Sequence, residues 1–212
     1  MTSIVPGRRD LLLGGGALLA GAAAPLPASS QTAAPRAPAI SDYAVFTEFS
    51  PATKPMAPGW NRRIFTDTDA RRGNSIQCDL ATGIITLAPG AYRLSGFSMV
   101  AYSSEGDPPE TTTIRAPASA GYCRLRTYNP ALVVDSANLQ AIDNGDPSVI
   151  CIGSPSTPNL GPSVFDAIHE TATTAQLLLE HQSGTKPEQI YLRVFAQNSK
   201  WHAFARINIQ RL

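Results

Sequence analysis

Charged residues are scarce in this sequence. Asp, Glu, Lys and Arg make up 16% of its 212 residues, whereas an ordinary soluble domain has roughly a quarter. The 17 basic and 16 acidic residues give a net charge of +1, which excludes broad electrostatic adhesion to nucleic acid or to an anionic membrane. Few Lys and Glu, together with 16 Gly and 18 Pro, disfavour long helices and favour short strands joined by turns.

The sequence also lacks an apolar run that could span a membrane in the mature protein. The longest run, Leu11–Ala24, has 14 residues, and a spanning helix needs about 20. Arg8 and Arg9 stand directly before it and small residues follow it, which is the arrangement of a secretory signal. Paired arginines before a mildly apolar Gly/Ala segment resemble the twin-arginine signal of bacterial export. A general secretory signal that carries two arginines is the alternative.

Cleavage after Ala28 or Ser30 divides the chain into three parts. They are a signal peptide over residues 1–30, an Ala/Pro linker over 31–43 and a folded domain over 44–212. No cysteine lies near the cut, so a lipid-anchored precursor is not expected. We therefore predict a periplasmic or secreted bacterial protein without a membrane span after the signal is removed.

Cysteine is rare, with only Cys78, Cys123 and Cys151. No two of them are close enough in sequence to form a metal clip, and we expect neither a metal nor a cofactor. Each lies in an expected strand, so small buried thiols are the simplest interpretation. A Cys78–Cys123 or Cys123–Cys151 disulfide is the alternative.

From Ala44 onward the pattern is that of β-strands separated by turns. About ten short strands at this spacing predict an all-β, two-sheet sandwich or a closed barrel. The last strand shows the period of two, with Ile207 and Ile209 on one face and Phe204 and Asn208 on the other. The candidate strands are Ala44–Phe49, Arg63–Thr66, Ser75–Asp79, Gly83–Leu87, Ala91–Ser103, Gly121–Tyr128, Ser148–Gly153, Ser163–His169, Ala175–Gln182, Gln189–Ala196 and Trp201–Gln210.

One segment carries a family resemblance. Residues 83–95, GIITLAPGAYRLS, resemble the strand–turn–strand signature of the complement/tumour-necrosis-factor jelly roll. Pro89-Gly90 closes the turn, Tyr92 and Leu94 are expected to point inward, and Gly96 permits close packing. The resemblance extends over roughly Ala44–Leu212 and implies a two-sheet antiparallel jelly-roll sandwich. Similar patterns occur in bacterial and phage surface modules, often as trimeric heads, which implies a homo-oligomer with a trimer favoured.

We find no catalytic constellation, and we expect no enzyme. Glu180 and His181 are neighbours on a strand and therefore face opposite ways, and no G-x-S-x-G elbow is present. His181 is expected to be a sheet histidine with a satisfied hydrogen bond. Asp143-Asn144-Gly145-Asp146 offers calcium-friendly oxygens but lacks the later glutamate of a full calcium loop, so a turn is the better interpretation.

Two surfaces are candidates for binding. Arg124 and Arg126 alternate with nearby tyrosines on one strand, a pattern that suits a solvated sheet face, a sugar or an anion. The aromatic platform of a carbohydrate-binding sandwich would consist of Trp60, Tyr102, Tyr122 and Tyr128.

The second surface is a predicted subunit interface. Tyr191, Phe195, Phe204 and Leu178 lie opposite the apolar faces of their strands, and one exposed apolar patch of this kind commonly marks a subunit contact. A loop such as Asn129–Pro162 folding over them is the alternative. The predicted function is an exported, non-enzymatic jelly-roll module that binds an unknown protein or glycan, or assembles. A periplasmic carbohydrate-binding or carbohydrate-active β-sandwich is the alternative.

Overall fold

The computed structural model describes residues 42–102, 121–130, 146–158, 161–182, 190–193 and 202–212. Over these ranges the chain forms fourteen strands and no helix. The signal peptide and nearly all of the linker, with Arg8 and Arg9, lie outside the described residues. No helix in the part of the chain that is described is long and apolar enough to cross a membrane.

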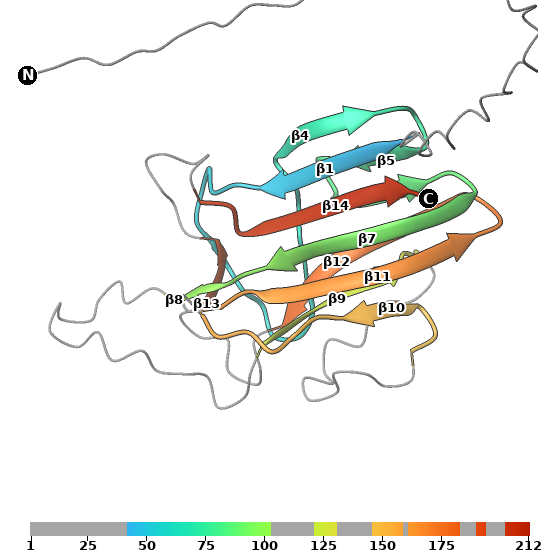
Figure 1. The fold of residues 1–212 in the computed structure, drawn as a ribbon. Helices are drawn as coiled ribbons and strands as arrows, with labels where there is room; N and C mark the ends of the chain where they lie inside the picture. The colour runs from blue at the N-terminus through green and yellow to red at the C-terminus, as the bar shows by residue number, and fades with distance from the viewer. Residues whose placement is uncertain (1–41, 103–120, 131–145, 159–160, 183–189, 194–201) are drawn as a thin grey trace, which may run out of the picture. The chain divides into compact units, whose positions relative to one another are not determined.

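Five strands form the first sheet, in the order β11-β7-β14-β1-β4 (Figure 1). All of its pairings are antiparallel. The strands are β1 (Tyr43–Glu48), β4 (Asp67–Arg72), β7 (Gly90–Ser98), β11 (Ser163–Thr171) and β14 (Ala205–Arg211).

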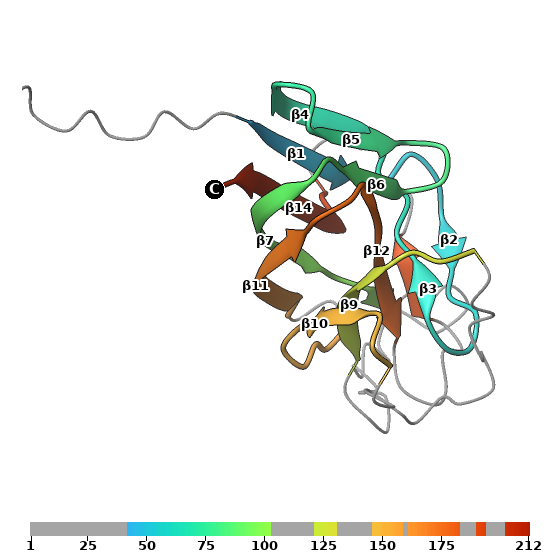
Figure 2. The ribbon, with the colours of Figure 1, turned by 90° about the vertical axis from the view of Figure 1, so that its right-hand side faces the viewer.

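Six strands form the second sheet, in the order β10-β9-β12-β6-β5, with β3 also paired to β12. Its pairings are antiparallel as well, and it forms a separate layer behind the first sheet (Figure 2). The strands are β3 (Asn61–Arg62), β5 (Ile76–Asp79), β6 (Ile84–Leu87), β9 (Tyr122–Thr127), β10 (Val149–Ile152) and β12 (Ala175–Gln182).

The connections between these sheets make the fold a jelly roll. The chain passes from β6 in the second sheet to β7 in the first, and from β10 to β11 and back to β12. Two antiparallel sheets joined in this way are the architecture expected of a jelly roll, so the predicted fold class is confirmed. A small third sheet at one end was not predicted; it consists of β2 (Lys54–Pro55), β13 (Ile190–Arg193) and β8 (Ala101–Tyr102).

The core lies between the two large sheets and follows the period of two. In β14, Ala205, Ile207 and Ile209 are buried, as the alternation predicted. In β12, Leu177 and Leu179 face the same core. The sequence therefore identified the inward faces of these central strands correctly.

The signature segment also behaves as expected. Tyr92 and Leu94 are completely buried, and the Tyr92 hydroxyl donates a hydrogen bond to the carbonyl of Ala88, 2.8 Å away. At Gly96 a Cβ would lie 2.0 Å from the carbonyl oxygen of Arg206 on the adjacent strand β14. A glycine is therefore required where β7 approaches β14.

Two strand assignments differ from the sequence prediction. Arg63–Thr66, predicted as a strand, connects β3 to β4, and the strand that follows is Asp67–Arg72. This strand is an edge strand with an exposed, polar sequence, so its alternation carries no hydrophobic signal. Ala91–Ser103 was also predicted as one strand, but it is divided between β7 and β8.

Candidate functional site

The predicted apolar patch is not formed as one exposed surface. Leu178 is 0% exposed and Phe204 is 4% exposed, Tyr191 is half-buried, and Phe195 lies outside the described residues. The prediction failed because it assumed neighbouring strands. Leu178 lies in the second sheet, Tyr191 in the third, and Phe204 directly before β14 of the first.

Two side chains in contact flank Leu178 on the outer face of the second sheet. Arg62 lies opposite Glu180 in the β3–β12 pair, and its guanidinium lies over the ring of Tyr128, 5.3 Å from the centroid. The amide of Tyr128 binds the carbonyl of Gln176. Arg62 and Tyr128 are therefore paired with the β12 positions on either side of Leu178.

Exposed apolar side chains gather instead on the outer face of the first sheet. Val164 is 53% exposed and Ile168 is 67% exposed on the edge strand β11. Phe97, opposite Val164 on β7, is half-buried. A sheet whose other face packs on the core is expected to be polar on its outer side, so these side chains need an explanation beyond the fold.

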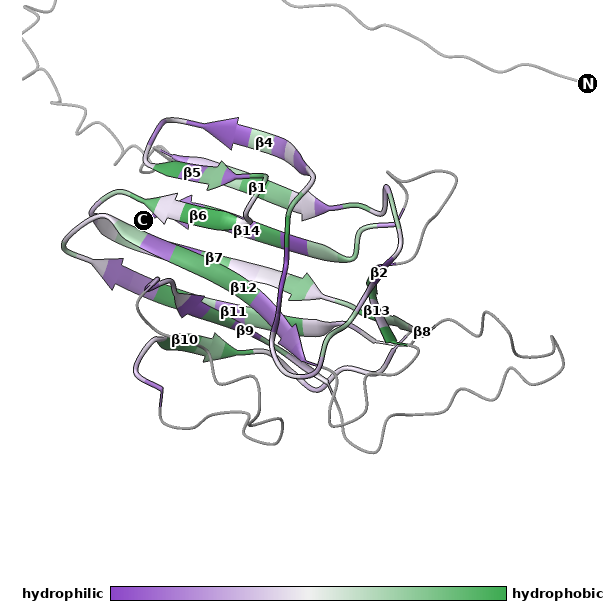
Figure 3. Cartoon of the chain, turned by 180° about the vertical axis from the view of Figure 1, so that it is seen from behind, coloured by the Kyte–Doolittle hydropathy of each residue, from purple (hydrophilic) through white to green (hydrophobic). Residues whose placement is uncertain are grey.

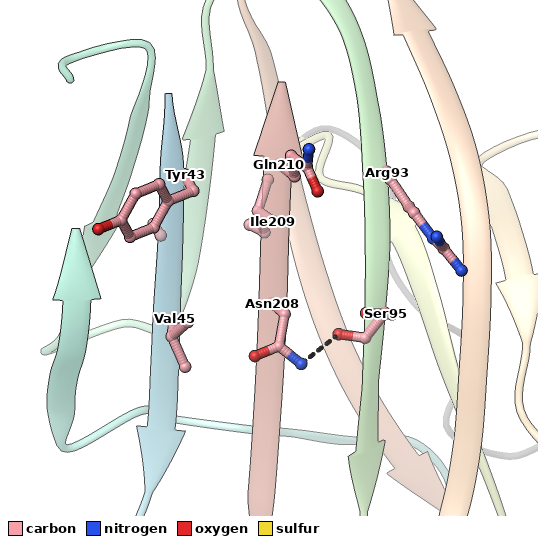
Figure 4. Close-up of a pocket in the computed structure, with 8 residues that line it drawn as sticks. Tyr43, Val45, Arg93, Ser95, Asn208, Ile209 and Gln210 are labelled. Atoms are coloured by element: carbon pink, nitrogen blue, oxygen red, sulfur yellow. Dashed lines mark hydrogen bonds between the residues drawn. The ribbon is translucent and has the colours of Figure 1, made fainter. Parts of the chain in front are cut away.

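A shallow hollow of about 200 Å³ lies beside them, across β7, β14 and β1. Tyr43 and Arg93 stand at its two sides, with Asn208 and Ser95 between them (Figure 4). Arg93 also binds Asp166 of β11 at 2.7 Å. The hollow therefore has Tyr43 at one side and Arg93 at the other, and Val45 adds an apolar side chain to its lining.

The outer face of the second sheet carries the predicted stripe. Tyr122, Arg124, Arg126 and Tyr128 alternate on β9 and its end, so they share one face. Figure 3 shows that the end of the neighbouring strand β12 is hydrophilic, at the position of Glu180 and the residues after it. The common orientation that the sequence predicted is confirmed.

The prediction of a solvated face at the two arginines is wrong. Arg124 and Arg126 are 6% and 3% exposed, and both pair with the buried Glu180. The Nε atoms of Arg124 and Arg126 donate to Glu180 Oε2 at 2.8 and 2.9 Å, and Arg126 Nη2 donates to Oε1 at 3.2 Å. Glu180 lies directly opposite Arg124 in the β9–β12 pair, and its carboxylate offsets the cost of burying both guanidiniums.

Two aromatic rings complete this face. The Arg124 guanidinium lies over the Trp60 ring, 4.1 Å from its centroid, and Arg62 lies over Tyr128. Each stack joins the β3 segment to β9 across β12, which lies between them. On this face, two arginine–aromatic contacts therefore lie beside two arginines that share the carboxylate of Glu180.

A second polar cluster lies inside the sandwich, around Arg63. Its side chain is completely buried, and its Nε donates to Ser98 Oγ at 2.8 Å. Nη1 donates to Glu48 Oε2 at 3.3 Å and to the Leu192 carbonyl at 2.6 Å, and Nη2 donates to the Met99 carbonyl. The sequence does not predict this cluster, because nothing in the pattern around Arg63 distinguishes a buried arginine from an exposed one on an expected strand.

His181 extends the cluster to the second sheet. Its Nδ1 lies 2.9 Å from Ser98 Oγ, and its Nε2 lies 3.2 Å from Ser156 Oγ. Both ring nitrogens thus have a hydroxyl partner, and a neutral imidazole donates through one nitrogen and accepts at the other.

This arrangement keeps the imidazole neutral. Complete burial, and then the positive charge of Arg63, hold the pKa of His181 well below its usual value of 6.5. Glu180 and His181 point to opposite sides of β12, as predicted, and His181 is a sheet histidine with satisfied hydrogen bonds. The Ser156–His181 pair lies in the core, with Ser156 only 3% exposed, and its role there is structural.

The three cysteines are free thiols. Cys123 is buried, and Cys78 and Cys151 are half-buried against the core. Burial raises the pKa of Cys78 to about 12 and that of Cys151 to about 11. At neutral pH both are therefore protonated and poor nucleophiles.

No group of three or more His, Cys, Asp or Glu that could hold a metal ion occurs within the described ranges. Of the calcium-friendly segment, only Asp146 is described, and its carboxylate accepts a hydrogen bond from the Ser148 amide at 2.8 Å. That contact is the one expected of a turn; Asp143, Asn144 and Gly145 lie outside the described residues.

These features define a jelly-roll module with two distinct outer faces. Solved structures of murine APRIL at pH 8.0 and at pH 5.0 are similar to the chain, with TM-scores of 0.47 and 0.46 and 6% sequence identity. Each match covers 81% of this chain and 98% of the APRIL chain. No protein-family model and no curated protein matches the sequence.

Proposed function

We propose that this protein is an exported, non-enzymatic jelly-roll module that assembles with copies of itself through the outer face of its five-stranded sheet. The observation that carries the proposal is the exposure of Val164 and Ile168 on the edge strand of that sheet. Apolar side chains at such positions are typical of subunit contacts.

A trimer is the assembly that we propose. The support is the resemblance of residues 83–95 to the complement/tumour-necrosis-factor jelly roll, whose bacterial and phage relatives often form trimeric heads. Ile168 on the edge strand and the hollow between Tyr43 and Arg93 lie on the same sheet, so both are available to one subunit contact.

Replacing Ile168 with Glu is expected to convert the assembly to monomer. A charge at the centre of the contact loses the apolar burial and must be desolvated. Mass by light scattering over a concentration series measures the result. Tyr191→Ser is the matched variant, because the sequence placed the contact there; loss of assembly in this variant alone, or a monomeric wild type at high concentration, would contradict the proposal.

Export rests on Arg8, Arg9 and the apolar run that follows them. Changing both arginines to Lys keeps the positive charge of the signal. It removes the arginine pair that resembles the twin-arginine export signal. We expect precursor to accumulate in the cytoplasm, measured by fractionation and immunoblotting. Unchanged export would instead support the general secretory route.

A carbohydrate-binding role is the second candidate, and one observation favours it. Of the proposed aromatic platform, Trp60, Tyr122 and Tyr128 gather on the outer face of the six-stranded sheet, while Tyr102 lies in the small third sheet. This face is opposite the one proposed for assembly, so the two roles are compatible.

A further inference from the structure

The outer face of the six-stranded sheet has more positive than negative charge at its centre. The guanidiniums of Arg124 and Arg126 bind the carboxylate of Glu180, and a third arginine, Arg62, lies opposite Glu180 in the β3–β12 pair. Asp146 lies near enough to interact electrostatically with Arg124 and Arg126. Counting both carboxylates, the group keeps an excess of one positive charge.

Arg62 is the guanidinium that remains available. It is half-buried, and among the described residues no carboxylate lies within ion-pair distance of it. Its contact with the Tyr128 ring is a cation–π contact, which does not use up the N–H donors of the guanidinium as an ion pair would. The edge of a guanidinium matches a carboxylate in a bidentate pair.

Aromatic rings surround this position. Trp60, Tyr122 and Tyr128 are each half-buried on the same face. Trp60 uses one side of its ring for Arg124. Rings of this kind offer a broad apolar side together with a polar edge, which suits the faces of a sugar ring.

We propose that this face binds an anionic saccharide, in which a uronate carboxylate pairs with Arg62 and the sugar ring packs against the neighbouring aromatic side chains. Arg124, Arg126 and Glu180 act beneath as a rigid base, since their hydrogen bonds fix the positions of the groups above them. The excess charge selects an acidic over a neutral sugar. The site consists only of residues on the face opposite the proposed subunit contact, so it does not depend on assembly.

The test compares two sugars that differ only at one carbon. Methyl β-glucuronide carries a carboxylate where methyl β-glucoside carries a hydroxymethyl group, and each is titrated against the full chain by ligand-observed NMR. We expect the glucuronide to bind at least about tenfold more tightly, the effect of a charge-assisted bidentate pair. Its affinity is expected to fall as salt is raised.

Variants locate the site. Arg62→Gln is expected to weaken glucuronide binding about tenfold, and Arg62→Lys to restore only part of it. Arg71→Gln, which removes an exposed arginine on β4 of the other sheet, is expected to bind as the wild type does. The thermal transition of each variant confirms that it is folded.

Five outcomes would overturn the proposal. They are equal binding of the two sugars, no binding of either, wild-type affinity in Arg62→Gln, equal loss in Arg71→Gln, and binding of sulfate as tight as that of the glucuronide. Inorganic sulfate is the third ligand in the titration. If sulfate binds as tightly as the glucuronide, the site recognises an anion without a sugar ring, and the proposal of a saccharide ligand is wrong.

Discussion

Mild acid is expected to destabilise the protein, at a pH well above that at which its carboxylates titrate. His181 is neutral in the folded chain because its pKa is held well below 6.5 by burial and by Arg63. Below about pH 6.5 the unfolded chain binds a proton that the folded chain does not. The free energy of unfolding should be level above pH 7 and fall by about 1.4 kcal/mol for each pH unit below 6.5.

Urea unfolding between pH 7.5 and pH 4.5 measures this slope. Hydrogen bonds hold the pKa of Asp42, Asp79 and Asp166 below 3.8 in the folded chain. The stability that they contribute begins to be lost below about pH 5, where the unfolded chain takes up protons at these carboxyls, so the slope between pH 6.5 and pH 5 reports the histidines.

Two variants show how much of the fall in unfolding free energy with pH comes from each histidine. Burial also lowers the pKa of His169, so His169→Gln should remove a smaller part of the acid sensitivity and His181→Gln the larger part. Should His181→Gln fail to fold, an NMR titration of the wild-type imidazoles decides the question. A His181 signal that titrates near pH 6.5 in the folded protein would show that the idea is wrong.

Glu48→Gln is expected to cause a large loss of stability at neutral pH. Glu48 is completely buried and accepts from Arg63 at 3.3 Å and from Arg193 at 2.7 Å. The amide keeps the shape but leaves the Arg63 guanidinium buried without its counter-charge. Breaking a buried pair in this way costs about 3–5 kcal/mol, a fall in Tm on the order of 10 °C for a domain of this size.

The matched control is Asp166→Asn in the exposed pair with Arg93, whose side chains are 54% and 59% exposed. Solvent screens this pair, so the melting temperature of Asp166→Asn should equal that of the wild type within error. Calorimetry of the three proteins makes the comparison. Equal effects of the two substitutions would mean that the Glu48 cluster is not a buried ion pair in solution.

The chain's own pattern was sufficient to predict much of the fold. Alternation in β14 placed Ile207 and Ile209 in the core, and the segment from Gly83 to Gly96 predicted the turn and the inward Tyr92. Strands on the core are recognisable because one face must be apolar. The polar edge strand Asp67–Arg72 was missed for the same reason, since neither of its faces is deeply buried.

For the candidate sites as well, the sequence predicted local orientation but not contacts between distant strands. Sequence alone determined that Arg124 and Arg126 share a face and that Glu180 and His181 point apart, because these follow from local spacing. Only the tertiary structure decided that Glu180 binds both arginines, that Arg62 lies over Tyr128, and that Arg63 joins Glu48 to Ser98. Those contacts join strands that are distant in the sequence, and strand pairing between such segments is set by how the whole core packs.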